Sequence, residues 1–133
     1  MVIVDTALEK REREGNPIRV ALVGAGYMGR GIALQILTGT VGMRLAAVSN
    51  RHIAEAKRAY TEAGVESIST VETVGDLEEA IAKKKFAVTE DAMLLCRAEN
   101  IDAIIDATGE VEFGAQIALE AIHHRKHVIM MNA

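Results

Sequence analysis

The sequence has few of the residues that cross-link small proteins or fill their cores with rings. It contains no Trp, two Phe, two Tyr, one Pro and a single cysteine, Cys96. One cysteine excludes a disulfide framework within the chain and a thiolate metal site, and it leaves a reducing cytoplasm as the expected location. Because aromatic residues are scarce, aliphatic residues and Met must build the core. That composition suits short buried parallel strands covered by helices.

Long apolar runs are also missing. No stretch approaches the roughly 20 residues that a membrane-spanning helix needs, so no membrane partner is expected. The mixed charges from Glu9 to Glu14 are unlike the apolar segment of a signal peptide. A formal net charge of -4 gives no reason to expect nucleic acid as a partner. The 133 residues are enough for one domain with one sizeable core.

The order of the predicted elements indicates the fold class. Residues 5–14 have the pattern of a charged helix that Gly15-Asn16-Pro17 ends, so residues 1–17 are expected to form an N-terminal helical arm. From residue 18 to residue 133, short apolar runs alternate with helical patterns, as they do in βαβ units with a parallel sheet. Strands are expected at 18–23, 43–48, 86–88, 101–107 and 127–131, and helices at 27–37, 52–63, 76–85, about 90–98 and 111–124.

This assignment leads to several further expectations. Asp76 would be the N-cap of its helix, and residues 65–75 would be a loop. The fold would be α/β, a doubly wound parallel (Rossmann) sheet truncated after the fifth strand. The usual sixth strand and a substrate or catalytic domain would both be absent from this chain. The apolar pair Met130-Met131 is expected in the core.

The strongest functional signal is a glycine motif. Gly24, Gly26 and Gly29 have the spacing G-x-G-x-x-G, directly after an apolar strand and directly before a helical pattern. In this motif the first glycine allows a tight turn, the second lets the backbone approach a pyrophosphate, and the third lets the helix pack closely on the sheet. The first helical amides, beginning at Tyr27 and Met28, then face the phosphates. The alternative is a strand-turn-helix without a ligand, and the flanking pattern favours the dinucleotide site.

The end of the second strand bears on the form of the dinucleotide. NAD sites usually have Asp or Glu there to bind the ribose hydroxyls, whereas this chain has no carboxylate between Ser49 and Glu55. Asn50 can donate to the ribose, and Arg51 can pair with a 2′-phosphate while its plane stacks on adenine. The alternative is that Arg51 is a solvated residue at a helix start. We expect NADP as the cofactor rather than NAD.

A second candidate segment, Asp106-Ala107-Thr108-Gly109, follows the fourth predicted strand. Open α/β sheets bind ligands at such strand ends, where Thr108 could donate to a phosphate or ribose oxygen and Gly109 could keep the backbone clear of the cofactor. A plain strand-to-helix turn is the alternative. Asn132, at the matching end of the last strand, is a weaker candidate for facing the nicotinamide.

Other polar clusters have simpler explanations. His123 and His124 are neighbours on one helix and point in different directions, while His127 begins a strand, so no metal site is expected. Histidines near a helix end more often complement the helix dipole. Glu110 and Glu112 are typical acidic residues of a first helical turn.

Four segments together resemble one family of oxidoreductases. They are the charged arm with the glycine motif (residues 8–31), Ser49-Asn50-Arg51, Asp106–Gly109 and Lys126–Asn132. In this order they are similar to the start of the homoserine dehydrogenase-like oxidoreductases that carry a C-terminal SAF domain, a group that includes NADPH-using proteins like deoxyxylulose-phosphate reductoisomerase. The resemblance implies that substrate-binding and catalytic residues lie beyond the nucleotide domain, in a longer protein.

Two functions follow from these patterns. In the first, the chain is the NAD(P)-binding part of a longer enzyme that transfers hydride between NADP(H) and a small polar alcohol or carbonyl, and the isolated chain is inactive. Its partners would be the dinucleotide, a substrate bound only by the full-length protein, and further copies of that protein in a homo-oligomer. In the second, the chain is a free-standing nucleotide-binding or redox-sensing module without catalysis.

Overall fold

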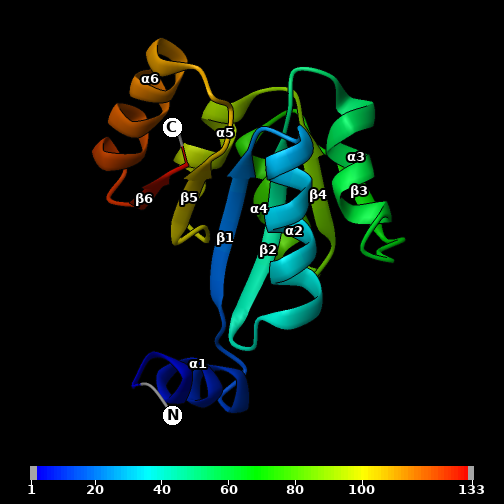
Figure 1. The fold of residues 1–133 in the computed structure, drawn as a ribbon, viewed down its shortest axis with the longest axis vertical. Helices are drawn as coiled ribbons and strands as arrows, with labels where there is room; N and C mark the ends of the chain where they lie inside the picture. The colour runs from blue at the N-terminus through cyan, green and yellow to red at the C-terminus, as the bar shows by residue number, and fades with distance from the viewer. Residues whose placement is uncertain (1–2, 132–133) are drawn as a thin grey trace.

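The computed structural model describes residues 3–131, with side chains from Thr6 onward. Six strands form one sheet with helices on both faces, and the first helix lies beyond one end of the sheet (Figure 1). The strands are β1 (Ile18–Val23), β2 (Met43–Ser49), β3 (Ile68–Thr70), β4 (Phe86–Thr89), β5 (Ala103–Asp106) and β6 (His127–Met130). The helices are α1 (Ile3–Arg13), α2 (Tyr27–Gly39), α3 (Ile53–Thr61), α4 (Val74–Ala82), α5 (Ala92–Arg97) and α6 (Val111–His123).

The strand order confirms the predicted fold class. The sheet runs β3-β4-β2-β1-β5-β6, and every neighbouring pair is parallel. After β1 the chain adds β2, β3 and β4 on one side, with β3 at the edge and β4 between β2 and β3. It then crosses back to add β5 and β6 on the other side. The carboxyl ends of β1, β2 and β5 therefore meet where the strand order reverses, the usual ligand position in open α/β sheets.

The predicted number of strands is wrong. Residues 65–75 are not all loop, because Ile68–Thr70 pairs with β4 as a sixth strand at the edge of the sheet. The five predicted strands are all present, and this strand is additional to them. The additional strand, β3, lies at one edge of the sheet, and β6 lies at the other edge. In the usual fold the sixth strand is added next to the strand that corresponds to β6. A three-residue strand is too short to show a periodicity in the sequence.

The predicted cap of α4 is also wrong. Thr73, and not Asp76, is the N-cap residue: its backbone is extended, and its hydroxyl oxygen accepts a hydrogen bond from the Asp76 amide at 3.0 Å. Asp76 lies in the first turn, where its carboxylate still complements the positive end of the helix dipole.

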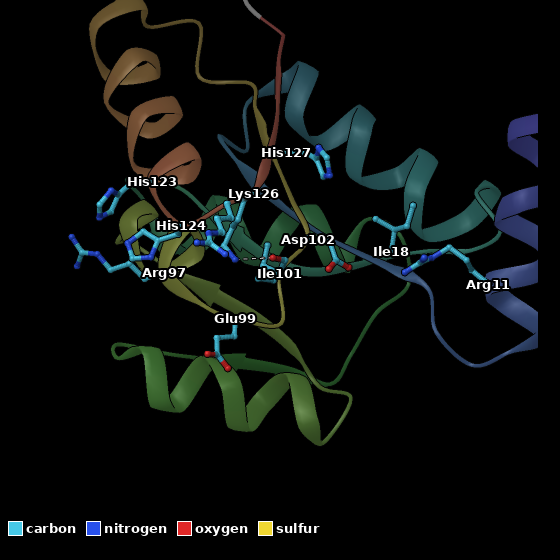
Figure 2. Close-up of a pocket in the computed structure, with 11 residues that line it drawn as sticks. Arg11, Ile18, Arg97, Glu99, Ile101, Asp102, His123, His124, Lys126 and His127 are labelled. Atoms are coloured by element: carbon cyan, nitrogen blue, oxygen red, sulfur yellow. Dashed lines mark hydrogen bonds between the residues drawn. The ribbon is translucent and has the colours of Figure 1, made fainter.

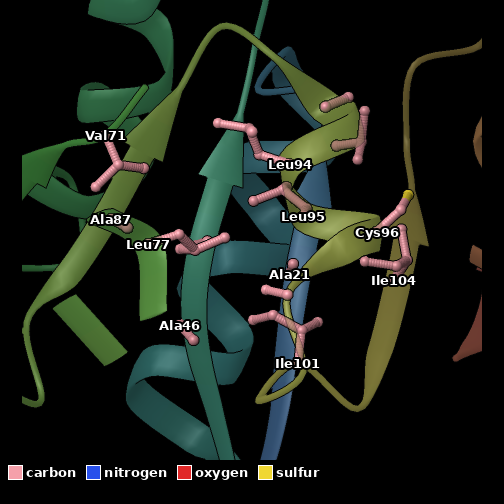
Figure 3. Close-up of a cluster of buried hydrophobic side chains, with 14 of the residues drawn as sticks. Ala21, Ala46, Val71, Leu77, Ala87, Leu94, Leu95, Cys96, Ile101 and Ile104 are labelled. Carbon is pink, nitrogen blue, oxygen red and sulfur yellow. The ribbon is translucent and has the colours of Figure 1, made fainter. Parts of the chain in front are cut away.

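Two apolar layers fix the sheet between its helices. Alternate residues of β1 point to opposite faces, with Ala21 in one layer and Leu22 in the other. The layer shown in Figure 3 packs α4, α5 and α6 on the sheet, and Leu77 and Leu95 are fully buried in it. The other layer packs α2 and α3 on the opposite face. Its largest fully buried side chain is Tyr60, whose hydroxyl donates to the Leu45 carbonyl at 3.0 Å.

The N-terminal helix, α1, lies at the amino ends of the strands, at the opposite end of the sheet from the carboxyl ends of β1, β2 and β5. In Figure 1, α1 lies beneath the amino ends of β1 and β2. The amide of Gly42, in the turn before β2, donates to the Glu12 carboxylate at 3.1 Å. The helix ends close to the predicted position, at Arg13, and Gly15, two residues later, has a φ of +68°. Within residues 3–131, no helix has both the length and the apolar character needed to cross a bilayer.

Candidate functional site

A cleft lies at the carboxyl ends of β1, β2 and β5, with a volume of about 530 Å³. It is lined by residues from all three segments that the sequence singles out, among them Gly24, Gly26, Asn50, Arg51 and Thr108. The fold thus brings together residues that are up to 90 positions apart in the sequence, from Val23 to Phe113. Such a meeting of separate strand ends is a typical ligand site of α/β proteins.

The three motif glycines have different surroundings. Gly24 has a φ of +101°, and a Cβ there would lie 2.9 Å from the carbonyl carbon of Ala107, so neither the turn nor the packing admits a side chain. A Cβ on Gly29 would overlap the carbonyl oxygen of Gly24, so the predicted close packing of α2 on the sheet is confirmed. A Cβ on Gly26 would meet nothing within 4 Å. Gly26 therefore faces open space in the cleft, which a side chain would partly fill.

Three helices begin around this cleft without a side-chain cap. The N-cap residues of α2, α3 and α6 are Gly26, His52 and Glu110, and none of them makes a side-chain hydrogen bond to its own helix. All three line the cleft, whereas the N-caps of α4 and α5, Thr73 and Asp91, are not among its lining residues and do cap their helices. Uncapped first-turn amides and the positive ends of helix dipoles favour a bound anion.

The residues that begin α2 are directed outward. Tyr27 is 91% exposed and Met28 50% exposed, and the first turn of the helix contains no acidic residue that would repel an anion. Their side chains do not line the cleft. Their predicted contribution is through backbone amides, which is compatible with this exposure.

The glycine loop is held from two sides by side chains. Asn50 accepts a hydrogen bond from the Ala25 amide at 3.0 Å and donates to the His52 carbonyl at 3.1 Å. Arg30 donates to the Ala25 carbonyl at 3.0 Å and forms an ion pair with Glu55 at 3.2 Å. Asn50 therefore positions the loop, and one hydrogen of its side-chain amide is left for the ribose contact that the sequence predicts.

Arg51 is paired with a residue that the sequence analysis set aside. Its guanidinium donates to the Glu110 carboxylate at 2.9 Å, and both residues line the cleft. Glu110 lies directly after Gly109, which has a φ of +73°, in the loop between β5 and α6. The position of Glu110 after a strand end could have marked it as a site residue. It was missed because acidic residues are also typical of a first helical turn.

The hydroxyl of Thr108 is already engaged. It donates to the buried carboxylate of Asp106 at 2.8 Å and accepts from the Glu110 amide at 3.2 Å, while the Thr108 amide donates to the same carboxylate oxygen at 3.0 Å. The turn after β5 is thus fixed by Asp106, and the predicted donation from the Thr108 hydroxyl to a ligand would have to replace its hydrogen bond to Asp106. The remaining candidate, Asn132, lies outside the described residues.

A second cavity, of about 820 Å³, lies between the amino ends of β5 and β6 and the C-terminal ends of α5 and α6 (Figure 2). It is rich in cations, among them Arg97 and Lys126. Nζ of Lys126 donates to the carbonyls of Ala98 and Ile101, and burial lowers the pKa of this ammonium. Cations at helix C-terminal ends complement the dipole, so their positive charge is offset in place.

The histidines of this second cavity fit that structural role. His124 lies 3.6 Å from the Glu120 carboxylate, one helical turn earlier, and Arg97 donates to the same carboxylate. Within residues 3–131, no group of three or more His, Cys, Asp or Glu residues is arranged to hold a metal ion. Cys96 is fully buried, which raises the pKa of its thiol to about 11, so it is protonated and shielded at neutral pH.

Comparison with known proteins agrees with this geometry. Residues 18–130 match the family described as "Oxidoreductase family, NAD-binding Rossmann fold" (GFO/IDH/MocA). The chain belongs to this oxidoreductase family. No curated protein gives a significant match to the sequence.

Solved structures of inositol dehydrogenases have the same fold. The chain is 24% identical to scyllo-inositol dehydrogenase from Lactobacillus casei with bound NAD(H) and scyllo-inositol, with a TM-score of 0.64. It is 18% identical to myo-inositol dehydrogenase from the same organism in complex with NAD(H) and myo-inositol, with a TM-score of 0.65. It is 21% identical to myo-inositol 2-dehydrogenase from Lactobacillus plantarum, with a TM-score of 0.64. Each match covers 86% of this chain and 28% of the other. The chain thus spans little more than a quarter of the length of these enzymes.

Proposed function

We propose that this chain is the dinucleotide-binding domain of a longer oxidoreductase that transfers hydride between NAD(P)(H) and a small polar alcohol or carbonyl compound. The open space at Gly26 carries the proposal, because a Cβ-free backbone at the uncapped start of α2 is the arrangement that binds a pyrophosphate. The bound cofactor supplies the hydride chemistry, and this domain holds and orients it.

The proposed contacts divide by type of group. Backbone amides at the start of α2 would face the phosphates, and side chains at the ends of β2 and β5 would face the adenosine half. The proposed cofactor-binding residues are Gly24, Gly26, Tyr27, Met28, Gly29, Asn50, Arg51, Thr108 and Gly109. Gly24 and Gly29 act by shaping the loop, since their own positions admit no side chain.

Substrate binding and catalysis are assigned to the part of a longer protein that this chain does not contain. The neighbouring structures are dehydrogenases of cyclic polyols, which supports a small polar alcohol as the substrate class. The more specific assignment to homoserine dehydrogenase-like oxidoreductases with a SAF domain stays a prediction from the sequence, as does a homo-oligomeric full-length protein.

The form of the cofactor is the finer part of the proposal. The sequence favours NADP(H), because Arg51 stands where NAD sites have a carboxylate. The two inositol dehydrogenases from Lactobacillus casei were solved with NAD(H). The pairing of Arg51 with Glu110 bears directly on this choice.

Glycine variants of the loop and of α2 test the site. Gly26→Ala adds one methyl group in the cleft, and Gly31→Ala adds the same group on α2, where a Cβ also meets nothing within 4 Å. Both variants should fold. Calorimetric titration with NADH and NADPH should show binding weakened about tenfold or more by Gly26→Ala, a change of roughly 1.4 kcal/mol, abolished by Gly26→Val, and unchanged by Gly31→Ala. Equal affinities for all variants would show that the cofactor binds elsewhere.

A further inference from the structure

The cleft contains a carboxylate that the end of β2 does not supply. Arg51 follows β2 and Glu110 follows β5, on the two sides of β1, and the two residues are 59 positions apart in the sequence. Their side chains nevertheless meet at 2.9 Å across the cleft. Their side chains are 76% and 49% exposed, so a ligand in the cleft can reach both groups.

The two charges of this pair favour different cofactors. A free guanidinium binds a phosphate with charge-assisted hydrogen bonds and would favour the 2′-phosphate of NADP(H). A carboxylate accepts hydrogen bonds from ribose hydroxyls and repels a phosphate, which favours NAD(H). While Glu110 holds Arg51, much of the positive charge that a 2′-phosphate would use is already neutralised.

We propose that Glu110 is the residue that determines how strongly this cleft discriminates between NADP(H) and NAD(H). It acts in two ways: it neutralises Arg51, and it places its own negative charge beside the site. This inference rests on the proposed function, because it requires that a dinucleotide binds in this cleft. It adds a determinant from the loop after β5, whereas the pattern read from the sequence placed the choice of cofactor at the end of β2 alone.

Other charged groups of the cleft do not share this position. Glu90 and His52 also line it, but neither makes an ion pair or a side-chain hydrogen bond to Arg51 among the described residues. Glu112, one residue into the first turn of α6, is exposed and is not among the lining residues. It has the same charge on the same turn, and it is the matched control for Glu110.

The experiment measures the dissociation constants of NADH and NADPH by titration, following nicotinamide fluorescence at low salt. The proteins are the wild type, Glu110→Gln, Arg51→Ala, the double variant and Glu112→Gln. We expect the wild type to favour NADPH by less than about tenfold, and Glu110→Gln to raise this preference about tenfold, the effect of one unmasked charge-assisted contact. In the Arg51→Ala background, Glu110→Gln should raise the preference for NADPH less than about threefold, because the guanidinium that Glu110 neutralises is absent. Glu112→Gln should leave the preference within about twofold of the wild type.

The two hypotheses fail in different ways. If both cofactors bind and Gly26→Ala weakens them, but Glu110→Gln leaves the preference unchanged, the role of Glu110 is overturned and the proposed function stands. An equal effect of Glu112→Gln also overturns it, since the change would then reflect overall charge. If the wild type binds neither cofactor, the proposed function fails, and the role of Glu110 fails with it.

Discussion

The side-chain oxygen of Asn50 accepts a hydrogen bond from the amide of Ala25 at 3.0 Å, so the end of β2 is joined to the glycine loop after β1. The carbonyl of the same Ala25 accepts from Arg30. Both backbone groups at the centre of the loop are therefore satisfied by side chains before any ligand binds. A loop fixed in this way loses less conformational entropy on binding than a mobile one.

The first prediction concerns the hydrogen bond between the Ala25 amide and the Asn50 side chain. Asn50→Asp keeps an oxygen acceptor for the Ala25 amide, whereas Asn50→Ala removes it and leaves the partly buried amide unpaired. We expect Asn50→Ala to lower the free energy of unfolding by about 1–2 kcal/mol and to weaken binding of both cofactors. Asn50→Asp should keep most of the stability. Urea denaturation of the two variants checks this, and equal losses would mean that the bond contributes little.

The second prediction compares two glycines on α2. Gly29→Ala forces its Cβ against the Gly24 carbonyl, so we expect a loss of stability of about 1–3 kcal/mol, as for other overpacked sites. Gly31→Ala has open space and replaces glycine inside a helix, so it should stabilise the chain by up to about 1 kcal/mol. The measurement is the midpoint of thermal unfolding. A stabilising Gly29→Ala would show that α2 can shift away from the loop.

The third prediction concerns the alkaline limb of stability. Burial raises the pKa of Tyr60 well above its ordinary value in the folded chain, so the folded state holds this proton more tightly than the unfolded state does. The contribution is complete below the unfolded pKa of about 10 and is lost as the pH rises above it. Stability of the wild type should therefore fall above about pH 10.

The Tyr60→Phe variant isolates this contribution. It removes the hydroxyl that donates to Leu45, so it should be less stable by about 1 kcal/mol at pH 7, and its stability should decline less above pH 10. Tyr27→Phe is the matched control, because Tyr27 is 91% exposed and should behave like the wild type at both pH values. Chemical denaturation at pH 7 and pH 10.5 gives the comparison. Parallel pH profiles for the wild type and Tyr60→Phe would contradict the explanation.

The parts of the fold that were predicted from sequence have strong local signals. The strand before the glycine motif contains a run of buried aliphatic residues. The tight turn at Gly24 and the close packing at Gly29 were predicted from the glycine spacing together with the flanking strand and helix. The missed strand, Ile68–Thr70, has only three residues and is defined by its pairing with β4. The cap at Thr73 was missed because Thr and Asp are both common caps, and their sequence order does not say which backbone is extended.

The misassigned surface of β6 has a related cause. Met130, the last residue of β6, and Met131 after it are apolar but 45% and 41% exposed, since β6 is the outermost strand on its side of the sheet in the described part of the chain. An edge position is a property of the whole topology, which the local pattern does not contain. The helix on one face of this strand, α6, also leaves Leu119 70% exposed.

The candidate site was predicted in its location and only partly in its contacts. The carboxyl ends of strands β1, β2 and β5 meet, as the positions of the motifs in the sequence predict. The partner of Arg51, however, is Glu110, and the partner of the Thr108 hydroxyl is Asp106. Both pairings depend on how side chains are oriented in a loop. For Arg51 and Glu110, they also depend on contact across 59 positions of the sequence.

The pairing of β1 with β5 also affects how the chain acquires its cleft. Arg19 and Asp102, at the amino ends of these strands, are joined by a hydrogen bond across 83 positions. A contact of such long range forms only after a large loop has closed, so a half-folded chain that has joined β1 to β2 does not yet contain the cleft. A ligand held by all three strand ends therefore binds the fully folded domain alone. Its binding free energy is then added to the stability of every element, including strands and helices that it never touches.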